Sequence, residues 1–115
     1  MPRVKSRVAS RRRRKKILKA NKGYFGKRKN SIRTAHDAYW RSGVYAYRDR
    51  RAKKGDFRSL WITRINAAVR EYGMKYSTFI DGLKKNSIEI NRKTLAYLAM
   101  HEPESFKALV EKAKS

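Results

Sequence analysis

The first half of the chain is too strongly charged to build a hydrophobic core of its own. Residues 1–60 carry 22 Lys and Arg against three acids, for a charge of +19, whereas residues 61–115 add only +4. The densest part, residues 10–29, reads SRRRRKKILKANKGYFGKRK and holds eleven cations and no acid. Such a segment repels itself and is marginal as a free helix. We therefore expect a polyanionic partner, because a net charge of +23 exceeds what solubility requires.

Several classes of protein are excluded by the same composition. The chain has no cysteine, so it forms neither disulfides nor thiolate metal sites, which fits a reducing compartment. No apolar run approaches the roughly 20 residues that span a bilayer, and the N-terminus lacks the apolar core of a signal peptide. A mitochondrial presequence is also basic and poor in acids, but here the charge continues past residue 50. We expect a soluble protein of the cytosol or an organelle.

The second half has the apolar periodicity of a small helical bundle. A first helix presents one apolar face and stops at Gly73; Ser77, Asn91 and Pro103 suit the starts of three more. No alternating strand pattern occurs, so we predict an all-α fold, with residues 1–58 as a basic extension and residues 59–115 as a compact helical domain. The expected core residues are Phe57, Leu60, Trp61, Ile65, Ala68, Val69, Tyr72, Phe79, Ile80, Leu83, Leu95, Leu98, Met100, Phe106, Leu109 and Val110.

The extension is predicted to contain a short helix, a GYFG turn and a long helix. Cations of the short helix, residues 11–22, point in nearly every direction, which suits a crevice lined by phosphates and not a membrane surface. Ile17 and Leu18 supply a small anchoring contact. Glycines at 23 and 26 allow the turn, the first by a left-handed conformation. Two interpretations stay open for Tyr24 and Phe25, which either stack on or wedge between bases or merely cover the helix junction.

The long helix, residues 31–60, separates its charges more clearly. Tyr47, Arg51, Lys54 and Arg58 fall within an arc of roughly 60° at 100° per residue, with Arg48 close by. The opposite side is expected to pair Asp49 with Lys53, four residues apart. Arginine on the first face suits RNA, because its planar guanidinium binds phosphate oxygens in pairs.

Aromatic residues are interleaved with these cations. Tyr39, Trp40, Tyr45 and Tyr47 are able to stack on exposed RNA bases, or to pack against neighbouring protein or sugar. The sequence alone does not choose between the two.

The sequence contains no pattern that predicts a catalytic site or a metal site. His36 and His101 lie far apart with no cysteine, and neither has another histidine at metal-ligand spacing. Glu102 and Glu104 flank Pro103 at a helix start, where they complement the helix dipole. Neither a phosphate-binding glycine loop nor a nucleophile elbow occurs. We predict no enzyme, no cofactor, no metal and no small-molecule substrate.

A family resemblance covers the whole chain. The run YAYRDRRAKKGDFRSLWITRINAA is preceded by RRRRKKILKANKGYFG and followed by GMKYSTFIDGLKK, IEINRKTLAYLA and FKALVEKAK. Together these segments resemble the bacterial-type large-subunit ribosomal protein L-twenty family. The resemblance implies a long basic helical extension that threads into large-subunit rRNA, a helical RNA-binding globular end, direct binding early in subunit assembly, and no part in peptide-bond chemistry.

The resemblance and the charge pattern together define the expected partners. These are large-subunit rRNA and neighbouring ribosomal proteins, in a cytoplasmic or organellar ribosome. One alternative is a translational repressor that also binds its own mRNA leader, as some members of the family do; another is a chromatin-like or membrane-active cationic protein. The residues expected to bind rRNA are Arg3, Lys5, Arg7, Arg11, Arg12, Arg13, Arg14, Lys15, Lys16, Lys19, Lys22, Tyr24, Phe25, Lys27, Arg28, Lys29, Arg33, Arg41, Tyr47, Arg48, Arg50, Arg51, Lys54, Arg58, Arg64, Lys84, Lys85 and Arg92.

Overall fold

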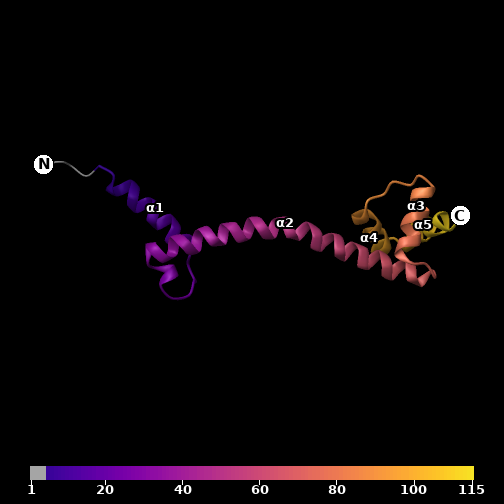
Figure 1. The fold of residues 1–115 in the computed structure, drawn as a ribbon, viewed down its shortest axis with the longest axis horizontal. Coiled ribbons are helices and arrows are strands. Elements are labelled where there is room, and N and C mark those ends of the chain that lie inside the picture. Colours follow the sequence, from indigo (N-terminus) through magenta and orange to yellow (C-terminus); the bar gives the residue numbers. More distant parts are fainter. Residues whose placement is uncertain (1–4) are drawn as a thin grey trace. The chain divides into compact units, whose positions relative to one another are not determined.

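A computed structural model describes residues 5–115, and every regular element in that range is helical. The helices are α1 (Arg7–Ala20), a short 3-10 helix η1 (Gly26–Lys29), α2 (Ile32–Glu71), α3 (Tyr76–Lys85), α4 (Arg92–His101) and α5 (Pro103–Lys114), all visible in Figure 1. The all-α prediction is confirmed. The chain forms two compact units, Met1–Arg51 and Ala52–Ser115, and α2 contributes residues to both.

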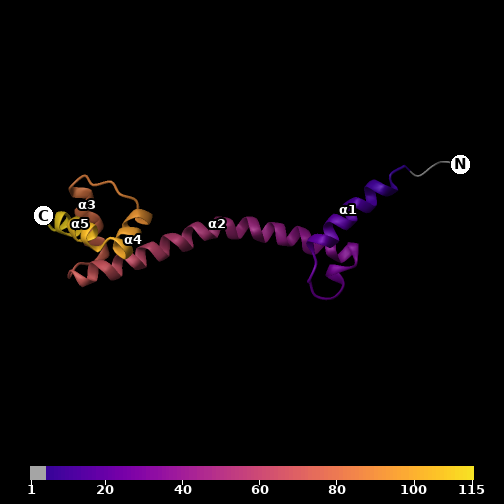
Figure 2. The same cartoon turned by 180° about the vertical axis from the view of Figure 1, so that it is seen from behind.

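The hydrophobic core lies in the C-terminal unit. Figures 1 and 2 show α3, α4 and α5 gathered at the C-terminal end of α2 in both views. Trp61, Ala68 and Tyr72 are partly buried against this core. Each of the four helices contributes because each presents an apolar stripe at helical spacing. The buried residues are Ile65, Val69, Phe79, Leu83, Leu95, Ala96, Phe106, Val110 and Ala113.

Three residues expected in this core are exposed instead. The exposed fraction of the residue is 44% for Phe57, 40% for Leu60 and 54% for Met100. Phe57 and Leu60 share the apolar face of α2, but they precede Trp61, where packing against the other helices begins. Helical periodicity identifies a face without stating how far along the helix that face is covered.

The helix ends follow the expected capping residues with one exception. Gly73 ends α2 with a φ of 75°, while Met74 N–H donates to Val69 O, the pattern of a Schellman cap. Asn91 caps α4 by accepting a hydrogen bond from Thr94 N–H at 2.8 Å, and α5 begins at Pro103. The expected cap at Ser77 is wrong. The N-cap of α3 is Lys75, whose N–H donates to the Thr78 hydroxyl at 3.2 Å.

Helices α3 and α5 approach each other closely at Gly82. A Cβ added at this residue would meet the backbone of Ala113, at 3.0 Å from its Cα and closer still to its carbonyl oxygen. The side chain of Asn86 ties the two helices together, because its Nδ2 donates to Gly82 O at 2.9 Å and to Lys112 O at 2.8 Å. A glycine is therefore required by packing at this helical position.

The N-terminal unit has almost no apolar core. Among residues 5–51, the part of this unit that the structure describes, the buried residues are Ala35 and Asn21, and none lies in α1. The expectation of a helix over residues 11–22 is confirmed, but the helix begins at Arg7 and ends at Ala20. The long helix expected over residues 31–60 and the apolar helix expected to stop at Gly73 are a single helix, α2, which stays regular through both Gly43 and Gly55.

Candidate nucleic-acid interface

Nearly all of the residues expected to bind RNA present their side chains to solvent. Within residues 5–115, Tyr24 and Arg92 are partly buried, and the remaining candidates are exposed. Arg3 lies outside the described residues. In that same range only Arg48 and Lys85 form an ion pair with an acid. The other cations keep their charges free for an external anion.

Four lysines converge on one open hollow of about 390 Å³. Lys15, Lys19 and Lys22 come from α1 and its C-terminal end, Lys29 comes from η1, and Leu18 supplies the apolar part of the lining. Lysine ammonium groups are compact and carry up to three donors, so a group of them attracts phosphate oxygens. The anchoring contact expected from Ile17 and Leu18 is consistent with their partial burial.

The turn between α1 and η1 depends on glycines and on one buried amide. Gly23 and Gly26 have φ values of 88° and 60°, which confirms the expected left-handed conformation at Gly23. Asn21 is completely buried, and its Nδ2 donates to Arg28 O at 3.1 Å and Ala35 O at 2.7 Å. These two bonds connect the end of α1 to η1 and to the first turn of α2.

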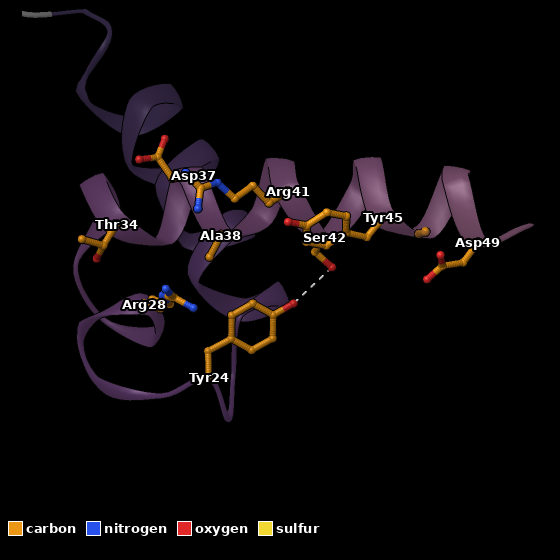
Figure 3. Close-up of a pocket in the computed structure, with 10 residues that line it drawn as sticks. Tyr24, Arg28, Thr34, Asp37, Ala38, Arg41, Ser42, Tyr45 and Asp49 are labelled. Atoms are coloured by element: carbon orange, nitrogen blue, oxygen red, sulfur yellow. Dashed lines mark hydrogen bonds between the residues drawn. The ribbon is translucent and has the colours of Figure 1, made fainter.

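The two aromatic residues of this turn have different surroundings. Tyr24 points toward α2, and its hydroxyl lies 3.3 Å from the Ser42 hydroxyl, as the dashed line in Figure 3 shows. Phe25 is 93% exposed. The covering interpretation therefore fits Tyr24, whereas Phe25 stays available for an external contact.

Cations and aromatic rings alternate along α2. The guanidinium of Arg48 lies 4.8 Å from the ring centroid of Tyr45, and that of Arg51 lies 4.9 Å from the ring centroid of Tyr47. Arg48 Nε also donates to Asp49 at 2.9 Å. The expected pair of Asp49 with Lys53 is wrong, because Asp49 is already satisfied by the adjacent arginine.

One hollow of about 590 Å³ combines both signs of charge (Figure 3). Tyr24 and Arg28 line it from the turn and η1, and Arg41 lines it from α2. Asp37 and Asp49 line it as well, although residues 1–60 contain only three acids. A phosphate entering here would meet two carboxylates, so this hollow is a poorer phosphate site than the lysine hollow.

Six candidate residues lie in the C-terminal unit. Lys54 and Arg58 belong to the predicted extension, and the other four are Arg64, Lys84, Lys85 and Arg92. Arg64 and Lys84 are exposed. Lys85 Nζ lies 2.8 Å from the Asp81 carboxylate, and this hydrogen bond, together with the charge of Asp81, raises the pKa of Lys85. Arg92 Nε donates to the Tyr76 hydroxyl at 2.8 Å, which holds its side chain against the domain. The structure therefore leaves Arg64 and Lys84 as the freest cations of the four.

Residues 5–115 contain no group of three or more His, Cys, Asp or Glu side chains placed to hold a metal ion. Within the same range, no helix is both long and apolar enough to cross a membrane.

Two residues with structural roles, Asn21 and Gly82, were not predicted from the sequence. Asparagine is common at helix ends and in turns, so the position of Asn21 indicates a turn but does not indicate that its side chain is buried. Gly82 stands inside a helix, where an isolated glycine usually has a packing or functional reason.

The comparisons with known proteins agree on one family. The family described as Ribosomal protein L20 matches residues 3–109. The large ribosomal subunit protein bL20 of Parvibaculum lavamentivorans is 58% identical over 115 residues, covering 100% of this chain and 98% of the relative. The protein of the same name from Methylobacterium radiotolerans is 59% identical, covering 100% of this chain and 92% of the relative. That from Rhizobium leguminosarum bv. trifolii is also 59% identical, covering 99% of this chain and 85% of the relative.

Proposed function

Because the chain belongs to the Ribosomal protein L20 family, we propose that it binds large-subunit rRNA directly and promotes early assembly of the large ribosomal subunit. The family consists of structural ribosomal proteins, and the chain is not an enzyme. Its partners in this role are rRNA and neighbouring proteins of the large subunit, and its place is the ribosome of the cytoplasm.

The observation that carries the proposal is the unpaired charge of the N-terminal unit. Within residues 5–51 only Arg48 has an acidic partner, and the remaining Lys and Arg side chains are exposed. Exposed like charges destabilise a compact state and are retained where they release counterions from a nucleic acid. The lysine hollow, formed by Lys15, Leu18, Lys19, Lys22 and Lys29, brings four of these charges around one opening.

We further propose that residues 1–58 provide affinity and residues 59–115 provide selectivity. The extension carries most of the cations, while the C-terminal unit presents Arg64 and Lys84 on a packed helical surface that is able to fit one RNA shape. The compact units divide after Arg51, seven residues before this functional boundary. The boundary at residue 58 stays a prediction, because it concerns which residues bind RNA and not which residues pack together.

A salt titration of the full chain tests the proposal. The variant Lys19→Gln/Lys29→Gln removes two charges from the lysine hollow, and Lys107→Gln/Lys112→Gln removes two exposed charges from α5. Each lost phosphate contact lowers the slope of log affinity against log salt by roughly 0.7–0.9. We expect the first variant to lose roughly 1.4–1.8 from the slope on a large-subunit rRNA fragment, while the second keeps the wild-type slope.

A random RNA of equal length provides the second arm of this titration. Wild-type protein should prefer the rRNA fragment at every salt concentration. Equal binding to both RNAs would contradict the proposal and would favour a non-specific cationic protein. The same titration against the leader of its own mRNA tests the repressor alternative, which requires a preference for that leader over the random RNA.

A further inference from the structure

An uncharged hollow lies beside Gly43 on α2. It has a volume of about 570 Å³, and residues of α2 form most of its lining, with the end of α1 and Tyr24 completing it. Its aromatic residues are Tyr24, Tyr39, Trp40 and Tyr47. Every lining residue, all of them within the described part of the chain, is uncharged. The hollow is therefore an aromatic site inside the most cationic region of the protein.

The fold of the chain does not use this aromatic surface. Trp40 is 60% exposed, and Val44 and Tyr47 are exposed as well. A Cβ added at Gly43 would have no atom within 4 Å, so no close packing requires a glycine there. Glycine inside a helix costs about 1 kcal/mol relative to alanine. Grouped aromatic surface and an unexplained helical glycine point to an external occupant.

The rings of this hollow are held in place before any partner binds. The indole Nε1 of Trp40 donates to Nε2 of His36 at 3.0 Å, four residues earlier on α2. Tyr39 lies edge-on to Trp40, with ring centroids 6.4 Å apart. The hydrogen-bonding group of Trp40 is thus satisfied, and its ring offers an apolar face that loses little conformational freedom on binding.

The charges beside the hollow identify the chemistry of its occupant. The guanidinium groups of Arg50 and Arg51 lie 6.0 Å and 4.9 Å from the ring centroid of Tyr47. A ligand that suits this arrangement has a flat apolar ring joined to an anion. An apolar protein segment would fill the hollow but would leave both guanidinium groups without an anionic partner. The hollow of Figure 3 differs, because Asp37 and Asp49 line it.

We propose that the hollow beside Gly43 takes one unpaired rRNA base, which stacks on its aromatic rings while Arg50 and Arg51 hold the adjoining phosphate. The proposal rests on the proposed function, since it names how that rRNA is contacted. Sequence-specific recognition of RNA commonly targets unstacked bases of this kind. Gly43 then serves to leave room for the base, in the way that glycine permits close approach of a ligand to backbone.

Filling the hollow tests the proposal in the full chain. Gly43→Leu places a side chain in the space of the base, and Gly55→Leu is the matched control on α2, where a Cβ also meets no atom within 4 Å. Both variants improve helix propensity, so circular dichroism should show an unchanged or higher helix content. A stacked base contributes about five- to hundredfold in affinity. We expect Gly43→Leu to bind a large-subunit rRNA fragment roughly tenfold more weakly, and Gly55→Leu to stay within about twofold of wild type.

Two readouts separate loss of stacking from loss of charge contacts. The slope of log affinity against log salt should be the same for Gly43→Leu as for wild type, because stacking itself neutralises no phosphate and because Arg50 and Arg51, which do not line the hollow, keep their phosphate contact. Chemical probing of the bound rRNA fragment should reveal one base that wild type and Gly55→Leu protect and Gly43→Leu does not. Trp40→Ala should expose the same base.

Each alternative outcome overturns the proposal. If wild type prefers the rRNA fragment over random RNA and Gly43→Leu binds it equally well with the same protections, rRNA binding stands and the base site is wrong. Such a result would favour a neighbouring protein as the occupant of the hollow. If wild type shows no preference for the rRNA fragment, the proposed function fails and the base site fails with it. A changed salt slope in Gly43→Leu would assign the hollow to phosphate contacts instead.

Discussion

Gly82→Ala should destabilise the C-terminal unit although alanine is the better helix former. The new methyl group would lie against the backbone of Ala113, so α3 and α5 would have to separate. A flexible side chain would move aside at little cost, but a backbone carbonyl is fixed by its own helix. Separation would also disturb the two hydrogen bonds that Asn86 Nδ2 makes to Gly82 O and Lys112 O.

The magnitude follows from three terms. Overpacking of a core costs about 1–3 kcal/mol, and the two disturbed hydrogen bonds contribute about 1 kcal/mol each. The gain in helix propensity offsets about 1 kcal/mol. The free energy of unfolding should therefore fall by about 2–4 kcal/mol. This is a large share of the total, because a unit of 64 residues, Ala52–Ser115, has a stability of roughly 3–10 kcal/mol.

Urea denaturation and hydrogen exchange of the full chain measure this effect. We expect the midpoint for the C-terminal unit to fall by at least about 1 M and the amides of α3 and α5 to exchange faster. Gly55→Ala is the matched control, because it makes the same change in open space on α2 and should stabilise by about 0.5–1 kcal/mol. Adding Ala113→Gly to Gly82→Ala should not restore stability, since the clash is with backbone. If Gly82→Ala gains stability as Gly55→Ala does, the packing argument is refuted.

Three further substitutions have defined outcomes. Trp61→Ala should cost about 2–3 kcal/mol by urea denaturation, less than the roughly 3–5 kcal/mol of a fully buried aromatic residue, because Trp61 is only partly buried; full stability would show that it is not part of the core. Ser87→Gly should stabilise the C-terminal unit by about 0.5–1 kcal/mol, because Ser87 has a φ of 56°; a lower urea midpoint would contradict this. Asn21→Asp should accelerate hydrogen exchange in η1, because a carboxylate cannot donate to Arg28 O or Ala35 O; wild-type exchange would show that these bonds are dispensable.

Local signals in the sequence predicted the helical segments and most of their ends, although α2 was expected as two helices and η1 as part of a turn. The ends of three helices are set locally, by Gly73, Asn91 and Pro103. These residues work through backbone conformation and through hydrogen bonds to residues at most five positions away. Ser77 failed as a cap because Thr78, the next residue, bonds the backbone of Lys75 and starts the helix earlier. Competing caps within two residues cannot be ranked from residue type alone.

Tertiary contacts account for what the sequence could not predict. Gly82 appears in the sequence as a weak helix residue, and its importance arises from Ala113, which is 31 positions later. Phe57 and Leu60 continue the apolar stripe of Trp61 without a partner helix to cover them. The rRNA-binding role of the candidate residues stays a prediction; the structure shows the exposure of most of them, which the sequence indicated because cations without an acidic partner stay at the surface.

Stability and charge are located in different parts of this protein. The apolar core belongs to the C-terminal unit, whereas in the described part of the N-terminal unit only Ala35 and Asn21 are buried. We therefore expect the stability of helix α1 to depend on whatever neutralises its cations. Added salt screens the repulsion within free α1 and favours its helix, yet the same salt weakens binding to RNA by reducing counterion release. The two effects oppose each other. If rRNA is the stabilising anion for α1, as the proposed function requires, it should be most effective at low salt, where the free helix is least stable.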